Sequence, residues 1–312
     1  AYPDRIAQRR PGSDGRFLLA GGRGAYLPQT EPLAASDYLV AAHLDAGTRE
    51  ARIFLAAPVH KHQLLAHFGD RIRDVEVIAW EHREQAVAAC RQRRLDELVI
   101  ADEMLDNPDP ELIVAAMLQG IRALGLSALP WTPKLRSWQQ RMQFLHGLDP
   151  QQWPAVSDQA LLDSLETWLA PFLTGITRAT HLSRVDLAGA LQTLLPWDRR
   201  QALEELAPAH VIVPSGSRIP VDYSGETPVL AVRLQEMFGA VDTPRVAGGR
   251  VTLLLHLLSP AGRAVQVTRD LASFWAGAYR EVKKDLKGRY PKHHWPDNPL
   301  QAQPTRRTKR KP

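Results

Sequence analysis

The pattern of the chain changes from strand to helix in the stretch Asp109-Pro-Glu-Leu-Ile-Val-Ala-Ala-Met-Leu-Gln-Gly-Ile-Arg-Ala-Leu124. Asp109 can cap a helix, Pro110 fits its first turn, and Glu111 suits the positive end of its dipole. Apolar side chains then recur at helical spacing, at Leu112, Ile113, Ala116, Met117, Gly120, Ile121 and Leu124. The stretch therefore predicts a helix that opens a helical domain over residues 108–208.

Upstream of this helix, residues 1–107 predict mainly short strands separated by glycine and proline. Turn signals include Gly21-Gly22, Gly47 and Asp106-Asn107-Pro108. Such a succession is typical of a small barrel or sandwich, and we predict an OB-like (oligonucleotide-binding) β-barrel over 1–107. The predicted strands are Phe17–Ala20, Ala25–Leu27, Tyr38–Leu44, Ala51–Ala57, Val75–Trp80, Ala86–Arg91 and Leu98–Ala101.

The helical domain contains four further predicted helices with apolar faces. They cover residues 135–145, 157–172, 185–195 and 198–206, with Ser157 as one of the caps. Five of the eight tryptophans lie between residues 131 and 197. Such a density favours a packed helical core, with a stacking platform for bases as the alternative.

Strands return in residues 209–298, which we predict to form a C-terminal α+β domain. His210–Val213 and Arg218–Tyr223 flank a turn as one hairpin, and Arg250–Leu257 and Ala264–Thr268 form a second.

A long basic helix follows from about Asp270 to Lys287, with Gly288 as its stop. Residues 299–312 are mainly Gln, Pro, Thr, Arg and Lys, and predict a disordered basic tail. The fold class is therefore α+β and multidomain: an OB-like barrel, a helical domain, and a C-terminal domain with β-hairpins and a long basic helix.

The composition is that of globular material, with 312 residues of which 44% are hydrophobic and 23% charged. A single cysteine, Cys90, excludes a disulfide framework and favours a reducing, cytoplasmic location. The richest apolar stretch, residues 251–258, is short and interrupted by His256, so no membrane segment is predicted. The start Ala1-Tyr-Pro-Asp4 has no initiator Met and does not resemble a signal peptide, which suggests excision from a longer chain.

The net charge of +5 is concentrated at one end of the chain. From Arg280 onward there are eleven Lys or Arg and three acids, so this segment carries +8 and the remaining residues together carry −3. Positive charge bears on a partner only through where it is clustered. The C-terminal end is therefore where an acidic partner is expected.

No catalytic, cofactor or metal site is predicted in this chain. Gly21-Gly-Arg-Gly24 has neither the spacing and lysine of a phosphate-binding loop nor the three-glycine dinucleotide pattern. The serines of residues 214–217 lie in a hairpin turn with no indicated base. His60 and His62 would point apart on a helix, and His67 would lie two turns from His60, too far to share one ion.

The strongest functional signal is basic and aromatic. Four cations fall at i, i+3, i+4 and i+7 and so line one face of the last helix: Arg280, Lys283, Lys284 and Lys287. Directly after them come Arg289, Tyr290, Lys292, His293, His294 and Trp295. Together they favour binding of phosphates and unpaired bases. The alternative stays open that the stripe is only solvated and that Tyr290 and Trp295 strap the chain onto the body.

A second basic patch lies at the N-terminus, where five arginines face two acids around the first strands of the predicted barrel. It adds four candidates to the nucleic-acid-binding set. The full set is Arg9, Arg10, Arg16, Arg23, Arg280, Lys283, Lys284, Lys287, Arg289, Tyr290, Lys292 and Trp295.

Five long motifs carry a resemblance to a known family. They are Leu129-Pro-Trp-Thr-Pro-Lys134, Val211-Ile-Val-Pro-Ser-Gly-Ser-Arg-Ile219, Ala247-Gly-Gly-Arg-Val251, Gln266-Val-Thr-Arg-Asp-Leu-Ala-Ser-Phe-Trp275 and Gly288-Arg-Tyr-Pro-Lys-His-His-Trp-Pro296. With them the chain resembles the C-terminal half of the bacterial HrpB branch of the DEAH-box ATP-dependent RNA helicases. One departure is His293-His294, where His followed by Pro is expected.

The resemblance implies that two motor domains, with a phosphate-binding loop and a DEAH motif, lie upstream. ATP and Mg²⁺ are expected in those motor domains, and no cofactor and no ATPase activity are expected in this chain. The implied partners are single-stranded RNA or another nucleic acid and the motor domains themselves. The predicted function is an accessory RNA-binding or regulatory region of a helicase; the alternative is a protein-docking or structural scaffold without direct nucleic-acid binding.

Overall fold

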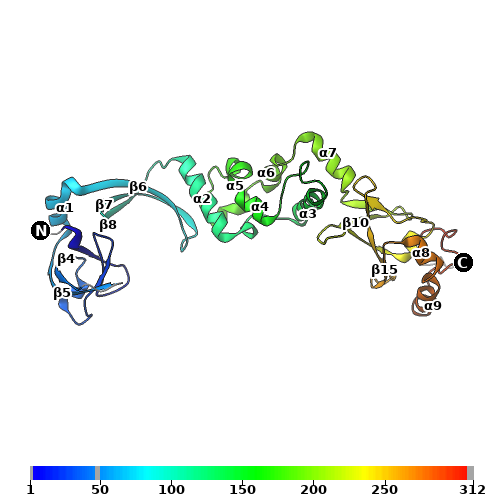
Figure 1. Ribbon diagram of the computed structural model, residues 1–312, viewed down its shortest axis with the longest axis horizontal. Coiled ribbons are helices and arrows are strands. Elements are labelled where there is room, and N and C mark those ends of the chain that lie inside the picture. The colour runs from blue at the N-terminus through cyan, green and yellow to red at the C-terminus, as the bar shows by residue number, and fades with distance from the viewer. Residues whose placement is uncertain (1–2, 46–49, 308–312) are drawn as a thin grey trace. The chain divides into compact units, whose positions relative to one another are not determined.

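The computed structural model describes residues 3–45 and 50–307 (Figure 1). The chain divides into two compact units. Unit 1 comprises Ala1–Ala123 together with Thr174–His181, and unit 2 comprises Leu124–Leu173 together with Leu182–Pro312. Each unit buries its own set of apolar side chains.

Unit 1 begins with a closed barrel of five strands. Their order is β1-β2-β3-β5-β4, and β4 pairs with β1 to close the barrel. Neighbouring strands are antiparallel except β3 and β5, which are parallel. Ala7, Phe17, Leu39 and Ile53 are among the side chains that fill the interior. The strands are β1 (Ile6–Arg9), β2 (Arg16–Leu19), β3 (Gly24–Tyr26), β4 (Tyr38–Leu44) and β5 (Glu50–Pro58).

The small β-barrel predicted near the N-terminus is thus confirmed, but its strands are not the predicted set. β1 goes unpredicted because it is short and Ile6 is its only large apolar side chain. The last three predicted strands form a separate antiparallel sheet in the order β6-β7-β8. Leu95 and Leu98 of this sheet pack against Ile6 and against Leu64 of α1. These elements are α1 (Lys61–Phe68), β6 (Ile72–Glu81), β7 (Ala86–Leu95) and β8 (Leu98–Met104).

The predicted helix that follows is confirmed as α2 (Pro110–Leu124), and most of it belongs to unit 1. A carboxylate oxygen of Asp109 accepts a hydrogen bond from the amide of Glu111 at 2.9 Å, as expected of a residue that begins a helix. Gly120 faces the indole of Trp80 on β6 so closely that a Cβ would overlap the ring. The absence of a side chain therefore lets α2 lie against the sheet.

Replacing Gly120 with Ala should destabilise the protein, although alanine is the better helix former, because the added Cβ has no room against Trp80. We expect a loss of about 1–3 kcal/mol in the free energy of unfolding, measured by chemical denaturation. The matched control is Gly147→Ala in α3 (Pro133–Leu148), where an added Cβ meets nothing within 4 Å. Equal destabilisation by both changes would contradict this packing.

Unit 2 contains the remaining helices. The helix predicted from Ser157 is divided at Ser164, whose hydroxyl donates to the carbonyl of Ala160 at 2.7 Å and so competes with the regular helical bonds. Trp168 is fully buried, and its indole N–H donates to the carbonyl of Leu161. The α-helices are α3, α4 (Asp158–Asp163), α5 (Leu165–Trp168), α6 (Leu187–Thr193) and α7 (Trp197–Leu206). Short 3-10 turns among these helices are Leu126–Ala128 and Ala170–Phe172, and the 3-10 turn Ala179–Arg184 begins in unit 1 and ends in unit 2.

A buried arginine joins α3 to the end of α7. The side chain of Arg141 is 6% exposed, and its guanidinium donates to the backbone carbonyls of Leu203 and Ala207. It also pairs with the Glu204 carboxylate at 2.9 Å. Carbonyls in the last turn of a helix lack intrahelical donors and attract a cation. Arg141 therefore fixes where α7 ends against α3.

The C-terminal part of unit 2 is built on a five-stranded sheet in the order β15-β14-β11-β10-β9. β11 and β14 are parallel, and the other neighbours are antiparallel. The pairs β9–β10 and β14–β15 confirm both predicted hairpins. The strands are β9 (His210–Ile212), β10 (Arg218–Asp222), β11 (Val229–Arg233), β14 (Leu254–Leu258) and β15 (Ala264–Thr268), with a small ladder of β12 (Arg245–Val246) and β13 (Val251–Thr252) and a 3-10 turn at Leu234–Met237.

Two helices replace the single long helix predicted near the C-terminus, so that prediction is wrong. α8 (Leu271–Ala276) stops at Gly277, whose φ and ψ of −115° and −89° leave the helical region, and α9 (Tyr279–Arg289) begins just beyond it. Glycine is a poor helix former, so a break at this position costs little. Trp275 and Tyr279, on either side of the break, both pack against Phe238 with ring centroids 6.1 and 6.3 Å away.

The tail is predicted to be disordered, but its described residues, 299–307, are docked on unit 2. The amide of Gly239 donates to the carbonyl of Pro299, and the amide of Thr305 donates to the carbonyl of Gln235, both at 2.9 Å. Residues 299–307 therefore depart from the prediction. The basic residues 309–311 and the predicted turn at Gly47 lie outside the described residues.

No helix within residues 3–45 and 50–307 is long and apolar enough to cross a membrane.

Candidate nucleic-acid interface

The predicted basic stripe lies on α9, but one of its four members is engaged internally. Lys283 forms an ion pair with Asp297, and the hydrogen bond and charge of Lys283 hold the pKa of that carboxyl below its usual value. Arg280, Lys284 and Lys287 are exposed. Among the described residues, these three have no acidic partner within ion-pair distance. We call them the α9 cations.

The segment after α9 is folded back onto the body of unit 2. Trp295 is 8% exposed, and its indole N–H donates to the carbonyl of Tyr290 at 2.9 Å. His293 contacts the side-chain oxygen of Gln235 through Nδ1 at 3.0 Å, and burial together with the charge of Arg233 lowers its pKa. The hydroxyl of Tyr279 donates to the carbonyl of Pro296 at 2.8 Å. This segment therefore straps the chain onto the body of unit 2, as the alternative to base stacking predicts.

The strap changes how the last candidates are interpreted. Because Trp295 is buried, little of its ring is left for a base, and the interpretation of Trp295 as a stacking residue is not supported. Tyr290 is half-buried, and Arg289 pairs with Asp285 at 3.1 Å. Lys292 is exposed and lies beyond the end of α9. The structure therefore brings cations, rather than rings, to this surface.

The N-terminal arginines gather on the barrel, but acids neutralise three of the four candidates. Arg9 pairs with Asp14 at 3.3 Å and with Asp37 at 2.8 Å. Glu50 pairs with both neighbouring candidates, at 3.6 Å from Arg10 and 3.0 Å from Arg16. The fourth, Arg23, lies in the turn before β3. Sequence counting misses this neutralisation because Asp37 and Glu50 come from later parts of the chain.

A groove beside these arginines holds one further cation, Lys61, and two histidines that the sequence-based set lacks. Its volume is about 1020 Å³, and it runs between the β1–β2 turn, the start of β4 and the start of α1. Lys61, His60 and His62 line it together with Arg9 and Arg10. The only sequence signal for it is the cluster His60-Lys61-His62, which lies some fifty residues from its basic neighbours.

The two histidines correct a prediction. They do not point apart, because the backbone of His60 is extended (φ −94°, ψ 151°) at the helix cap instead of helical. Their rings stack with centroids 5.6 Å apart and planes 9° from parallel. Within the described residues, no group of His, Cys, Asp and Glu is arranged to hold a metal ion.

The glycine turn also has a clear structural role. Gly21 and Gly22 lie between β2 and β3, and their amides donate to the carbonyls of Asp4 and Leu19. These N–H groups are therefore engaged within the protein and do not fit a phosphate-binding loop.

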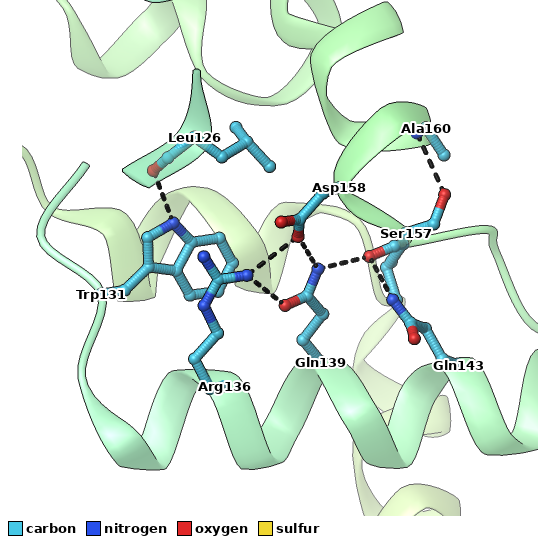
Figure 2. A network of polar contacts seen from close by, with 9 residues as sticks. Leu126, Trp131, Arg136, Gln139, Gln143, Ser157, Asp158 and Ala160 are labelled. Carbon is cyan, nitrogen blue, oxygen red and sulfur yellow. Dashed lines mark hydrogen bonds and ion pairs between the residues drawn. The ribbon is translucent and has the colours of Figure 1, made fainter. Parts of the chain in front are cut away.

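Trp131, in the first of the five motifs, is held by a network of polar contacts in unit 2 (Figure 2). Its indole N–H donates to the carbonyl of Leu126 at 2.9 Å, and the Arg136 guanidinium lies 3.8 Å from the ring centroid. Arg136 and Gln139 both donate to the same carboxylate oxygen of Asp158 at 2.8 Å. The ring is therefore covered by the protein's own cation, which favours the structural interpretation of this tryptophan.

The Asp158 carboxylate makes this network sensitive to acid. Partial burial opposes its ionisation, but hydrogen bonds from Gln139 and Arg136 outweigh that effect and hold the pKa of Asp158 below its usual value. A carboxyl with a lowered folded-state pKa stabilises the protein above its unfolded-state pKa and loses that contribution as the pH falls.

Asp158→Asn should lower the free energy of unfolding at pH 7 by about 1 kcal/mol, a figure reduced for the exposure of the carboxylate. It should also flatten the loss of stability of the wild type below about pH 4. Denaturation measured as a function of pH tests both expectations. The control is Asp163→Asn at the other end of α4, where the carboxylate accepts a bond from exposed Gln159. The same acid slope in the wild type and Asp158→Asn would contradict this role.

An apolar pocket lies between α3, α6 and α7 in unit 2, with a volume of about 410 Å³. Leu135, Trp138, Leu191 and Leu195 line it, with the cationic side chains of Lys134 and Arg200 among its polar lining residues. Trp197 begins α7 and is 80% exposed.

Comparison with known proteins places these features in a family. Residues 168–299 match the family model described as the C-terminal region of an ATP-dependent helicase, HrpB_C. The chain is 44% identical over 314 residues to the ATP-dependent RNA helicase HrpB of Escherichia coli strain K12. The aligned region covers 99% of this chain and 39% of that protein.

Two solved structures are also similar. The crystal structure of the E. coli DExH-box NTPase HrpB has 43% identity and a TM-score of 0.63, covering 98% of this chain and 38% of that one. A crystal structure of the Escherichia coli DEAH/RHA helicase HrpB has 40% identity and a TM-score of 0.55, covering 95% of this chain and 37% of that one.

The matched segment, residues 168–299, is similar to the C-terminal region of ATP-dependent helicases. Within this class, the resemblance to the HrpB branch is confirmed, and the chain corresponds to the C-terminal part of such a helicase. The chain spans about two fifths of the length of the relatives it matches.

Proposed function

We propose that this chain is an accessory RNA-binding region of an ATP-dependent RNA helicase. The observation that carries the proposal is the group of α9 cations, three exposed positive side chains on one helix without acidic partners among the described residues. Cations in such a row attract a phosphate backbone regardless of base sequence. The relative of E. coli is named an RNA helicase, which supports RNA as the partner.

The barrel supports the proposal from unit 1. We infer that it is of the oligonucleotide-binding kind, because its five strands close in the order β1-β2-β3-β5-β4 and a groove with cations opens beside its β1–β2 turn. Lys61 is the groove cation best placed to meet a phosphate, because Arg9 and Arg10 are already paired with acids. The groove would hold a single strand without reading its sequence.

The energy for remodelling RNA would come from elsewhere in the parent protein. Motor domains upstream would bind ATP and Mg²⁺ and hydrolyse the nucleotide, while this region holds or guides the strand. The turn at residues 21–24 does not fit a nucleotide, so no step of ATP hydrolysis is assigned to this chain.

Neutralising the α9 cations should weaken RNA binding and its dependence on salt. For Arg280→Gln/Lys284→Gln/Lys287→Gln, we expect the slope of log affinity against log salt to fall by about 2, since each phosphate contact on a single strand contributes about 0.7. Fluorescence anisotropy with a labelled single-stranded RNA between about 50 and 200 mM salt measures this slope.

A charge-matched control removes three exposed cations elsewhere in unit 2, with Lys134→Gln/Arg184→Gln/Arg263→Gln. It should leave the slope close to that of the wild type. Equal slopes for the two triple variants would show that the effect follows net charge and not the α9 surface. A wild-type chain without RNA binding at low salt would overturn the proposal.

The alternative of a protein-docking module is favoured by one observation, the apolar pocket between α3, α6 and α7 with exposed Trp197 on the same helix as Arg200. Exposed tryptophan and arginine are frequent anchors of protein interfaces. Absence of RNA binding by the wild type would favour this function over the first.

A further inference from the structure

An exposed aromatic side chain, Phe54, lies on β5 where the β4–β5 ladder is irregular. In the ladder between β4 and β5, Ala41 lies opposite Ala56, His43 opposite Leu55 and Leu44 opposite Ile53, so Ala42 is an extra residue on β4 and Phe54 is an extra residue on β5. Such a bulge redirects side chains and is frequent near functional sites. Phe54 faces outward as the alternation from buried Ala51 and Ile53 requires, and the alternation fails at Leu55. The two neighbours are therefore both exposed, at 54% and 62%.

The two exposed side chains do not fill the barrel interior. The interior is filled by Ala51 and Ile53 from the same strand, both buried. A single exposed apolar side chain is common on protein surfaces, but Phe54 and Leu55 are neighbours, and contiguous exposed apolar surface next to polar groups is one mark of a binding site.

A histidine and an arginine lie against the Phe54 ring, and further polar contacts hold the adjoining backbone. The His43 ring lies 5.3 Å from the Phe54 ring at an interplanar angle of 37°, and the Arg52 guanidinium lies 5.4 Å from the ring centroid. On the β4 side, Arg5 donates to the carbonyl of Ala42 at 2.9 Å. A carboxylate oxygen of Asp45 accepts a bond from the backbone amide of Arg52. We call His43, Arg52 and Phe54 the Phe54 platform.

We propose that the Phe54 platform stacks an unpaired base of a single-stranded nucleic acid. Every base has a flat π-face, and aromatic rings and guanidinium planes are the side chains on which unpaired bases stack. The flanking Arg52 adds attraction to a base or to its phosphate. A protein partner would be expected to meet a larger aliphatic surface than Leu55 alone provides. The inference rests on the proposed RNA-binding function and names one site where it acts.

The test uses the whole 312-residue chain and a labelled single-stranded RNA of about 12 nucleotides, within the range that one such barrel covers. Phe54→Ala should weaken binding about tenfold, as expected for loss of one stacked base. Phe54→Trp should keep binding within about threefold of the wild type, because it keeps a ring. The slope of affinity against salt should not change in either variant, since stacking displaces no counterion.

Two controls separate stacking from general damage. Val75→Ala removes another exposed apolar side chain, from β6, and should leave affinity unchanged. An RNA of the same length with abasic positions keeps its phosphates but has no bases there, so the wild type and Phe54→Ala should bind it alike. The melting temperature of Phe54→Ala should stay near that of the wild type because the side chain is exposed.

The possible failures are distinguishable. If the wild type binds RNA and Phe54→Ala binds equally well, or if Phe54→Ala weakens abasic RNA to the same extent, the stacking site is wrong and the RNA-binding function stands. If the wild type binds no RNA at all, both are overturned.

Discussion

The geometry of unit 2 depends on one buried charge. The Arg141 guanidinium on α3 cannot reach water freely, and an unpaired cation in that position would be strongly destabilising. It is satisfied by carbonyls at the end of α7 and by the Glu204 carboxylate. Because the chain passes from α7 into β9, the place where α7 ends sets where the C-terminal sheet begins. The hydroxyl of Tyr223 reinforces this point by donating to the carbonyl of Pro208.

Pairing of charges, rather than their number, decides which cations are available to a partner. The N-terminal arginines are clustered as their spacing suggests, yet Asp37 and Glu50 neutralise most of them. On α9 fewer cations are paired with acids, because Lys283 forms an ion pair with Asp297 while Lys284 and Lys287 stay exposed. The surface that can attract phosphate is therefore smaller than the basic composition suggests. The groove beside α1 adds Lys61, a cation that the composition does not single out as a candidate for phosphate binding.

Much of the fold follows from local patterns. Short runs bounded by glycine, proline and other turn signals predict β2 to β8, helical periodicity predicts α2 and α3, and turn residues predict both hairpins of unit 2, because each of these signals is contained within a few residues. The prediction of an element fails where residues far away in the chain determine whether that element forms or where it ends. β1 has too few apolar residues to be predicted as a strand from its own sequence, and it forms by pairing with β2 and β4. The break at Gly277 is accompanied by packing of Trp275 and Tyr279 on Phe238.

The candidate sites divide in the same way. The sequence by itself determined the family, through five long motifs, and the face of α9 on which its cations lie, since helical spacing sets that face. Only the tertiary structure decided that Trp295 is buried, that His60 and His62 stack, and that exposed Phe54 lies at a bulge beside His43 and Arg52. The physical reason is that exposure and pairing depend on residues far away in the chain, which come together only when the strands and helices pack.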